Sequence, residues 1–251
     1  MTDSNAHGDE RQDGEIRDRY DHDTSTKSMI VCGVAEKVVS RVLDDGLADR
    51  LSGRLALRQA YAGFRQRQNS LPARAVIAHR SDGRPHLPAQ PALHCSISHS
   101  HRFGVAAVAL TPVGIDIEKI LPRDPRLLDY VAKRTEVAAL RHLVGSATEL
   151  LTLIWTLKEA TAKASGVGLG LALRQLRVTA TGADSFEVDG WKAVSYQYEH
   201  FIVGLAFQQS AHYRPPIRWY QPRRLPAAGI AQDAIGAETI QTDSLQRQVS
   251  Q

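Results

Sequence analysis

The stretch that decides the fold is GIDIEK, at residues 114–119. Side chains alternate between the two faces of a strand, so Asp116 and Glu118 project from one face and the two isoleucines from the other. Two carboxylates so close on one face repel each other unless a cation lies between them, and oxygen ligands of this kind suit Mg²⁺. A strand whose exposed face happens to carry two acids explains the same hexapeptide equally well.

A second stretch, WTLKEATAK at residues 155–163, lies in a predicted helix. Residues four apart share a helical face, so Trp155, Glu159 and Lys163 line up, with Lys158 beside them. Taken alone, a Glu–Lys pair at this spacing is more often a solvated salt bridge than part of a site. The glycine-rich run SGVGLGL that follows either lets backbone approach a ligand closely or simply ends the helix.

Two further segments carry polar groups at predicted loops. CSISHSHRFG, at residues 95–104, offers Ser98 and His99 as phosphate ligands, and a turn capped by its own side chains is the alternative. DGRP, at residues 82–85, is a turn that presents Arg84. The GxSxG elbow of many serine hydrolases does not occur in the sequence, which argues against that class.

The hydrophobic periodicity between these segments predicts an α+β fold, because helical and strand patterns are mixed and joined by short loops. We expect helices over 35–68 (two, broken near Gly46), 127–144 and 147–165. We expect strands at 29–34, 75–79, 94–98, 103–110, 113–117, 176–180, 186–188, 193–198 and 201–208.

Composition bounds the function further. Residues 1–27 hold eight acidic and four basic side chains with almost no apolar ones, so we expect them to be disordered, and we expect a flexible tail over 224–251. Residues 28–223 carry 25 basic against 16 acidic side chains, which favours an anionic partner. Cys32 and Cys95 are expected to be packed thiols. No run is long and apolar enough for a membrane span or a signal peptide, so we expect a cytoplasmic protein.

DGRP, SISHS, GIDIE and WTLKEATAK, in this order, resemble the 4′-phosphopantetheinyl transferase superfamily, and within it the surfactin-synthetase-activating type. That type shows a G-[KR]-P turn, an S-x-S-H-S-like segment, a G-[IV]-D-[IV]-E strand and a W-[ST]-x-K-E-[AS]-x-x-K helix. The resemblance extends over roughly half of the chain, and its last two motifs are highly specific in combination. It implies two similar α+β halves, 28–112 and 113–223, that form a pseudo-dimer with the active site in the cleft between them.

The resemblance also implies roles for single residues. Asp116, Glu118 and Glu159 would hold Mg²⁺, with Mn²⁺ as the alternative cation, together with the pyrophosphate of coenzyme A. Ser98, His99, Arg84 and Lys158 would contact the coenzyme. Glu159 would accept the proton of the acceptor serine, and Lys163 would bind the coenzyme and stabilise the leaving group. Asp116, Glu159 and Lys163 are therefore the expected catalytic residues.

The implied reaction transfers 4′-phosphopantetheine from coenzyme A to a serine of an apo acyl or peptidyl carrier protein and releases adenosine 3′,5′-bisphosphate. The carrier would serve polyketide, nonribosomal peptide or fatty acid synthesis, and we expect a monomer that binds neither nucleic acid nor membrane. Three alternatives stay open from the residues: a basic nucleic-acid-binding module, a magnesium-dependent phosphohydrolase, and a catalytically idle scaffold that binds coenzyme A. Few aromatic residues, 6% of the chain, argue against the first.

Overall fold

We describe the protein from a computed structural model. The residues that the structure describes are 29–37, 45–66, 68, 71, 74–167, 173–208 and 217–220. The predicted terminal segments 1–27 and 224–251, and the glycines at 168 and 170, lie outside the described residues. Helices and strands are mixed along the chain, so the predicted α+β class is confirmed.

The first part of the chain contains one long helix between strands. Its elements are β1 (Ile30–Glu36), α1 (Asp45–Arg65), β2 (Ala78–His79), β3 (Pro85–His86), β4 (His94–Ser100) and β5 (Phe103–Ala109). Every residue of β5 is buried, because this strand is covered on both faces. Its sequence is accordingly a continuous apolar run rather than an alternating one.

The second part also contains one long helix, preceded by shorter ones. Its elements are β6 (Val113–Lys119), α2 (Arg126–Val131), α3 (Arg134–Leu140), η2 (Arg141–Leu143), α4 (Ala147–Ser165), η3 (Leu173–Gln175), β7 (Val178–Ala180), β8 (Ser185–Val188), β9 (Trp191–Tyr198), β10 (Phe201–Phe207) and β11 (Ile217–Tyr220). The helix α4 has the bounds that the sequence predicts. Ser146 caps its start by accepting a hydrogen bond from the N–H of Glu149, and the left-handed Gly166 ends it.

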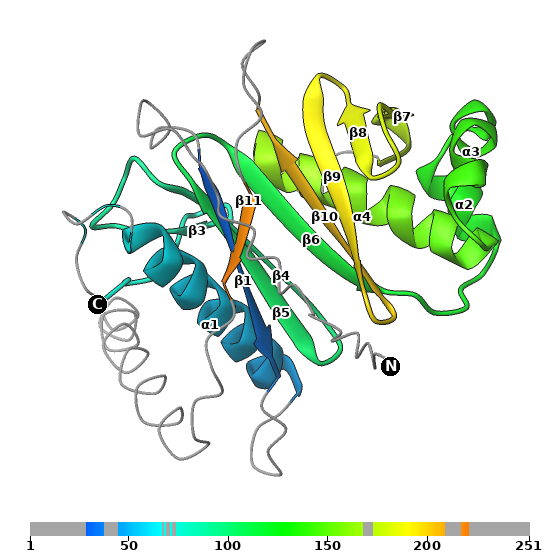
Figure 1. Ribbon diagram of the computed structural model, residues 1–251. Helices are drawn as coiled ribbons and strands as arrows, with labels where there is room; N and C mark the ends of the chain where they lie inside the picture. Colours follow the sequence, from blue (N-terminus) through cyan, green and yellow to red (C-terminus); the bar gives the residue numbers. More distant parts are fainter. Residues whose placement is uncertain are drawn as a thin grey trace, which may run out of the picture.

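Two main sheets hold most of the strands. The first has the order β11-β1-β5-β4 and the second the order β6-β10-β9-β8-β7, while β2 and β3 form a small separate ribbon. Figure 1 shows the two sheets in the middle of the molecule, with α1 on the outer side of one and α4 on the outer side of the other. The layers therefore run helix, sheet, sheet, helix.

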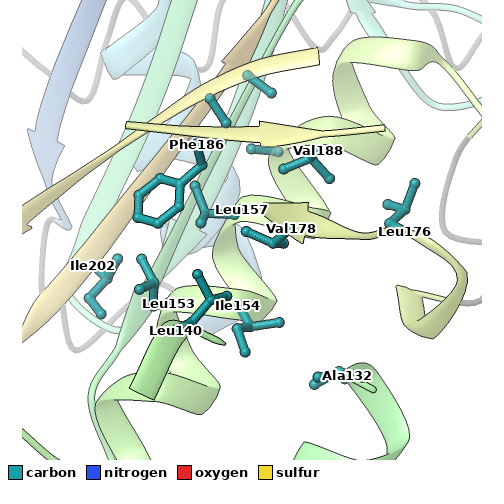
Figure 2. Close-up of a cluster of buried hydrophobic side chains, with 14 of the residues drawn as sticks. Ala132, Leu140, Leu153, Ile154, Leu157, Leu176, Val178, Phe186, Val188 and Ile202 are labelled. Atoms are coloured by element: carbon teal, nitrogen blue, oxygen red, sulfur yellow. The ribbon is translucent and has the colours of Figure 1, made fainter. Parts of the chain in front are cut away.

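Three apolar clusters fill the spaces between these layers. Alternate residues of β5 and β10 point inward and build the cluster between the two sheets, whereas the intervening residues pack under α1 or α4. The cluster under α4 joins this helix to α3 and to the strands from β7 to β10 (Figure 2). Leu153, Ile154 and Leu157 supply its helical side, and Phe186 and Ile202 are among its strand residues.

The two parts of the chain repeat one arrangement. In each, a first strand is followed by a helix and an antiparallel pair, and the last strand of the pair lies beside the first: β1 beside β5, and β6 beside β10. A Cβ atom on Gly33 would lie 2.1 Å from the carbonyl oxygen of Ala56, and one on Gly114 would lie 1.9 Å from that of Ala160. Both strands therefore need glycine where the helix backbone touches them.

The predicted helical region over 35–68 is wrong at its start. The strand β1 continues through Glu36, because Ala35 and Glu36 pair with Gly104 and Phe103 of β5. The helix α1 begins at Asp45, beside Gly46, so the described helix starts near the position where the break is predicted. Residues 38–44, where the first of the two predicted helices would lie, are outside the described residues.

The predicted helix over 127–144 is also corrected, since it is broken into α2, α3 and η2. Ala132 is extended, with φ −136° and ψ 155°. The N–H of Lys133 then donates to the carboxylate of Glu136, 3.3 Å away, at the start of α3. A buried glutamate that accepts a hydrogen bond from a backbone N–H in this way favours the start of a new helix over continuation of the preceding one.

No single described helix is long and apolar enough to cross a membrane. One pair of helical segments, Arg134–Leu143 with Ala147–Ser165, passes the same test together by length and composition alone, with a bend of 111° between them. Most of α4 is buried inside the protein, as expected of a core helix. The two cysteines are free thiols, Cys32 buried and Cys95 partly buried.

Candidate active site

The strand β6 and the helix α4 bring the predicted acidic residues together. Ile115 and Ile117 face the cluster between the sheets, so Asp116 and Glu118 project from the other face of β6, toward α4. Burial, followed by the negative charge of Asp116, raises the pKa of both Glu118 and Glu159. The three carboxylates therefore lie near enough to repel one another, which is the proximity that the family resemblance implies.

Asp116 is held by two neighbours from different elements. Its Oδ1 accepts hydrogen bonds from Lys163 Nζ and from the hydroxyl of Ser98, each at 2.7 Å. Its Oδ2 is buried and has no hydrogen-bond partner among the described residues. A buried carboxylate oxygen without a partner costs free energy, so this atom marks where a further positive group would be stabilising.

Glu118 has a different partner, Arg123, which lies in the loop after β6. The guanidinium donates to Glu118 Oε2 at 2.6 Å and lies 5.7 Å from the centre of the Trp155 ring. Trp155 packs against the apolar cluster under α4. Arg123 was not among the predicted site residues, because it belongs to none of the four motifs.

The donor set fits a hard divalent cation in its chemistry. Three carboxylates lie near one another, two of them have a raised pKa, and one buried oxygen has no hydrogen-bond partner within the described part of the chain. Among the described residues, however, no three His, Cys, Asp or Glu side chains lie close enough to form a ready metal site. Lys163 and Arg123 instead neutralise Asp116 and Glu118.

Ser98 and His99 lie in β4 and point to opposite faces of it. Ser98 is buried against Asp116, whereas His99 is half-exposed, with its Nδ1 4.0 Å from Asp49 Oδ2. The alternate serines extend the contact, since the hydroxyls of Ser96 and Ser100 accept hydrogen bonds from backbone N–H groups of β6. The S-x-S-x-S alternation places the three hydroxyls on one face of β4, and there they join the two sheets.

Arg84 reaches from the first part of the chain to the end of α4. A Cβ atom added to Gly166 would lie 2.1 Å from a guanidinium nitrogen of Arg84, so the two residues are in contact. Arg84 also pairs with Asp82 at 2.7 Å, and its side chain remains about half exposed (48%). Gly166 also has φ +74°. Its lack of a side chain therefore allows the left-handed backbone at the helix end and leaves room for the Arg84 guanidinium.

Lys158 is not brought to the carboxylate cluster, which corrects its expected place at the coenzyme. Its ammonium is fully buried on another face of α4 and donates to the carbonyl oxygen of Val131 at 2.7 Å and to Glu136 Oε2 at 2.9 Å. Glu136 Oε1 in turn accepts the N–H of Val178 at 2.8 Å. In this arrangement Lys158 joins α2, α3, α4 and β7.

The repeat in the fold shows that the acidic cluster belongs to one part of the chain. Asp116 lies opposite Gly204 in the second sheet, and Ala35 lies opposite Gly104 in the first. Each of these glycines contacts its helix at the corresponding place. Alanine therefore stands in the first half where aspartate stands in the second.

A cavity of about 190 Å³ lies between the two sheets, lined mainly by apolar residues from β1, β5, β6, β9 and β10. Ile117 is its contribution from β6. Because Ile117 points away from the face that carries Asp116 and Glu118, this cavity lies on the opposite side of the strand from the acidic cluster. It is not the predicted cleft.

Comparison with known proteins agrees with the resemblance drawn from the motifs. Residues 112–213 match the family model of the 4′-phosphopantetheinyl transferase superfamily. A 4′-phosphopantetheinyl transferase of Bacillus subtilis is 36% identical over 109 residues, which are 43% of this chain and 48% of the relative. The 4′-phosphopantetheinyl transferase Sfp of Bacillus subtilis (strain 168) is 34% identical over 97 residues, 38% of this chain and 43% of the relative.

The chain spans about half the length of these curated relatives. Among solved structures, holo-[acyl-carrier-protein] synthase of Thermotoga maritima has 19% sequence identity and a TM-score of 0.34, over 40% of this chain and 64% of the other. That likeness is too slight to carry an argument. The family resemblance is confirmed by the sequence matches, and the matched segment contains Asp116, Glu118, Glu159 and Lys163.

Proposed function

We propose that this protein transfers the 4′-phosphopantetheine group of coenzyme A to a serine of an apo acyl or peptidyl carrier protein. The observation that carries the proposal is the convergence of Asp116, Glu118 and Glu159 beside Lys163, inside the segment that matches the transferase family. An acidic cluster next to a lysine suits a reaction at a phosphate group, in which positioning and charge neutralisation supply most of the catalysis.

We propose Mg²⁺ as the cation, with Mn²⁺ as the alternative. Asp116, Glu118 and Glu159 would hold it, and the Oδ2 of Asp116, which has no partner among the residues that the structure describes, is the first oxygen available to it. When bound, the ion offsets the negative charge of the coenzyme A pyrophosphate. Arg84 and His99, both about half exposed, would bind other phosphate oxygens of the coenzyme.

The chemical step forms one bond and breaks one. Glu159 accepts the proton of the carrier serine as the serine oxygen attacks the phosphorus that bears pantetheine. The bond from this phosphorus to the bridging oxygen breaks, and adenosine 3′,5′-bisphosphate leaves with that oxygen. Lys163 stabilises the charge that develops on the leaving group. The raised pKa of Glu159 makes it a better proton acceptor than an ordinary carboxylate.

The choice of acceptor separates this proposal from a phosphohydrolase. With coenzyme A and Mg²⁺, we expect adenosine 3′,5′-bisphosphate to form when an apo carrier protein is present. A carrier whose acceptor serine is changed to alanine should support none. Formation of the bisphosphate at the same rate with water as the sole acceptor would favour the hydrolase instead. Chromatography of the nucleotides measures both rates.

The proposed carrier is an acidic protein, in keeping with the basic charge of residues 28–223. The elements that build the site come from one chain, so we propose that a monomer is active. Proteins of polyketide, nonribosomal peptide and fatty acid synthesis supply carriers of this kind, and we propose them as the substrate class.

Ser98→Ala should lower kcat by about tenfold while changing the KM for coenzyme A less than about twofold, because the lost bond to the Asp116 carboxylate is of the charged kind. The hydroxyl orients Asp116 and does not face solvent. Ser100→Ala, which removes a longer 3.4 Å bond to the N–H of Lys119, is the matched control and should change both constants little. A large rise in KM with unchanged kcat would show that Ser98 contacts phosphate directly.

A further inference from the structure

Arg123, which belongs to none of the four motifs, forms an ion pair with one of the three carboxylates of the site. It lies four residues beyond the end of β6, and its guanidinium both pairs with Glu118 at 2.6 Å and lies over Trp155 at 5.7 Å. The side chains of Arg123 and Glu118 are 22% and 23% exposed, so solvent screens this pair only partly. The ring of Trp155 and the carboxylate together fix the direction of the guanidinium.

The described ionised groups of the cluster nearly balance. Asp116, Glu118 and Glu159 carry three negative charges in their ionised forms, and Lys163 and Arg123 carry two positive ones. The two cations thus supply the same charge as one divalent ion. The ammonium of Lys163 extends from α4, pairs with Asp116 and also lies beside the backbone of β6. The guanidinium of Arg123 pairs with Glu118 from a loop.

A divalent ion at this site would have to share Glu118 with Arg123. The guanidinium donates to one oxygen of the Glu118 carboxylate at 2.6 Å, and the ion would bind this same carboxylate together with the buried Oδ2 of Asp116, which has no partner among the described residues. Close approach of the ion and the guanidinium is repulsive, so the ion binds Glu118 at the expense of the Arg123 pair.

We propose that Arg123 is a positioning residue that acts through Glu118, as an internal counter-ion that competes with the divalent cation of the site. The inference rests on the carboxylate cluster of the proposed function. Arg123 keeps Glu118 directed toward the cluster while the cation is away, and it weakens the binding of the cation when coenzyme A is absent. The cation is then retained chiefly when the pyrophosphate adds its own oxygen ligands.

The test is a titration of the full chain with Mn²⁺ alone, without coenzyme A, followed by the electron paramagnetic resonance signal of free Mn²⁺. Arg123→Gln should lower the Kd for Mn²⁺ by about fivefold, the upper range for a partly exposed ion pair. Arg123→Lys, which retains the charge but loses the planar fork, should lower it less. Arg126→Gln is the matched control, since Arg126 lies in the same region and pairs with Asp124 in solvent.

Glu118→Gln should weaken Mn²⁺ binding, and adding Arg123→Gln to it should have a smaller effect than Arg123→Gln alone, because only the repulsion between the guanidinium and the cation is then removed. If Arg123 only stabilised the loop, Mn²⁺ binding would be weaker or unchanged in Arg123→Gln. This result would overturn the proposal. Absence of Mn²⁺ binding in both the unaltered chain and Arg123→Gln would overturn it as well. Failure of transfer to a carrier protein would overturn the proposed function without changing these Mn²⁺ affinities.

Discussion

Glu159→Ala should reduce transfer to a carrier protein by about 10³-fold, because it removes the proposed proton acceptor and a proposed cation ligand together. Glu159 is 9% exposed and lies among Asp116, Glu118 and Lys163. Its isosteric replacement Glu159→Gln should lose nearly as much activity, since the amide accepts no proton from the serine. Initial rates of bisphosphate formation measure both variants.

The matched control is Glu187→Gln, which removes a carboxylate paired with Lys192 at the surface. Its rate should stay within about twofold of the unaltered chain, as expected for an exposed ion pair. Thermal unfolding should show that the Glu159 variants remain folded. Transfer at an ordinary rate by folded Glu159→Ala would contradict the assignment of the proton acceptor.

Glu136→Ala should lower the free energy of unfolding by about 3–5 kcal/mol, the cost of breaking a buried ion pair from one side. The Lys158 ammonium would remain in the interior and keep its hydrogen bond to the Val131 carbonyl. The N–H of Val178 would lose its acceptor. Burial already lowers the pKa of Lys158, and its bond to Glu136 opposes that shift. Urea unfolding followed by circular dichroism measures the change.

The double variant Lys158→Met with Glu136→Leu tests the physical reason. It removes both charges and keeps apolar volume, so it should recover the part of the lost stability that the unpaired ammonium costs. A loss below about 1 kcal/mol in Glu136→Ala would contradict the account, because it would mean that the buried ammonium finds another partner or loses its charge.

The main acidic site could be predicted from local patterns. Alternation in a strand places Asp116 and Glu118 on one face, and helical spacing places Glu159 and Lys163 on another. Burial and mutual repulsion among these groups agree with that geometry. The bounds of α4 were also predictable, because Ser146 and Gly166 are standard helix boundaries.

The partners of the site could not be predicted in the same way. Lys158 is one residue from Glu159, about 100° around the helix, and which side faces the core depends on α3 and β7. Arg123 belongs to none of the motifs and reaches Glu118 only because of the path of the loop after β6. Ser98 reads as a phosphate ligand until β4 is placed beside β6.

The break between α2 and α3 has a similar cause. Residues 127–144 have a helical apolar pattern, but the extended Ala132 is stabilised by contacts that the pattern does not contain. The carbonyl of Val131 accepts from Lys158, and Glu136 accepts from Lys133 and Val178. Tertiary hydrogen bonds of a single buried pair thus outweigh local helical preference here.

The measurement that tests the central claim most directly is the intact mass of an apo carrier protein incubated with this protein, coenzyme A and Mg²⁺. We predict a gain of about 340 Da on the acceptor serine, the mass of a phosphopantetheine arm attached through a phosphodiester. The gain should disappear with a chelator and in Glu159→Ala. An unchanged carrier mass across polyketide, nonribosomal peptide and fatty acid carriers, with a protein that binds no coenzyme A, would contradict the account.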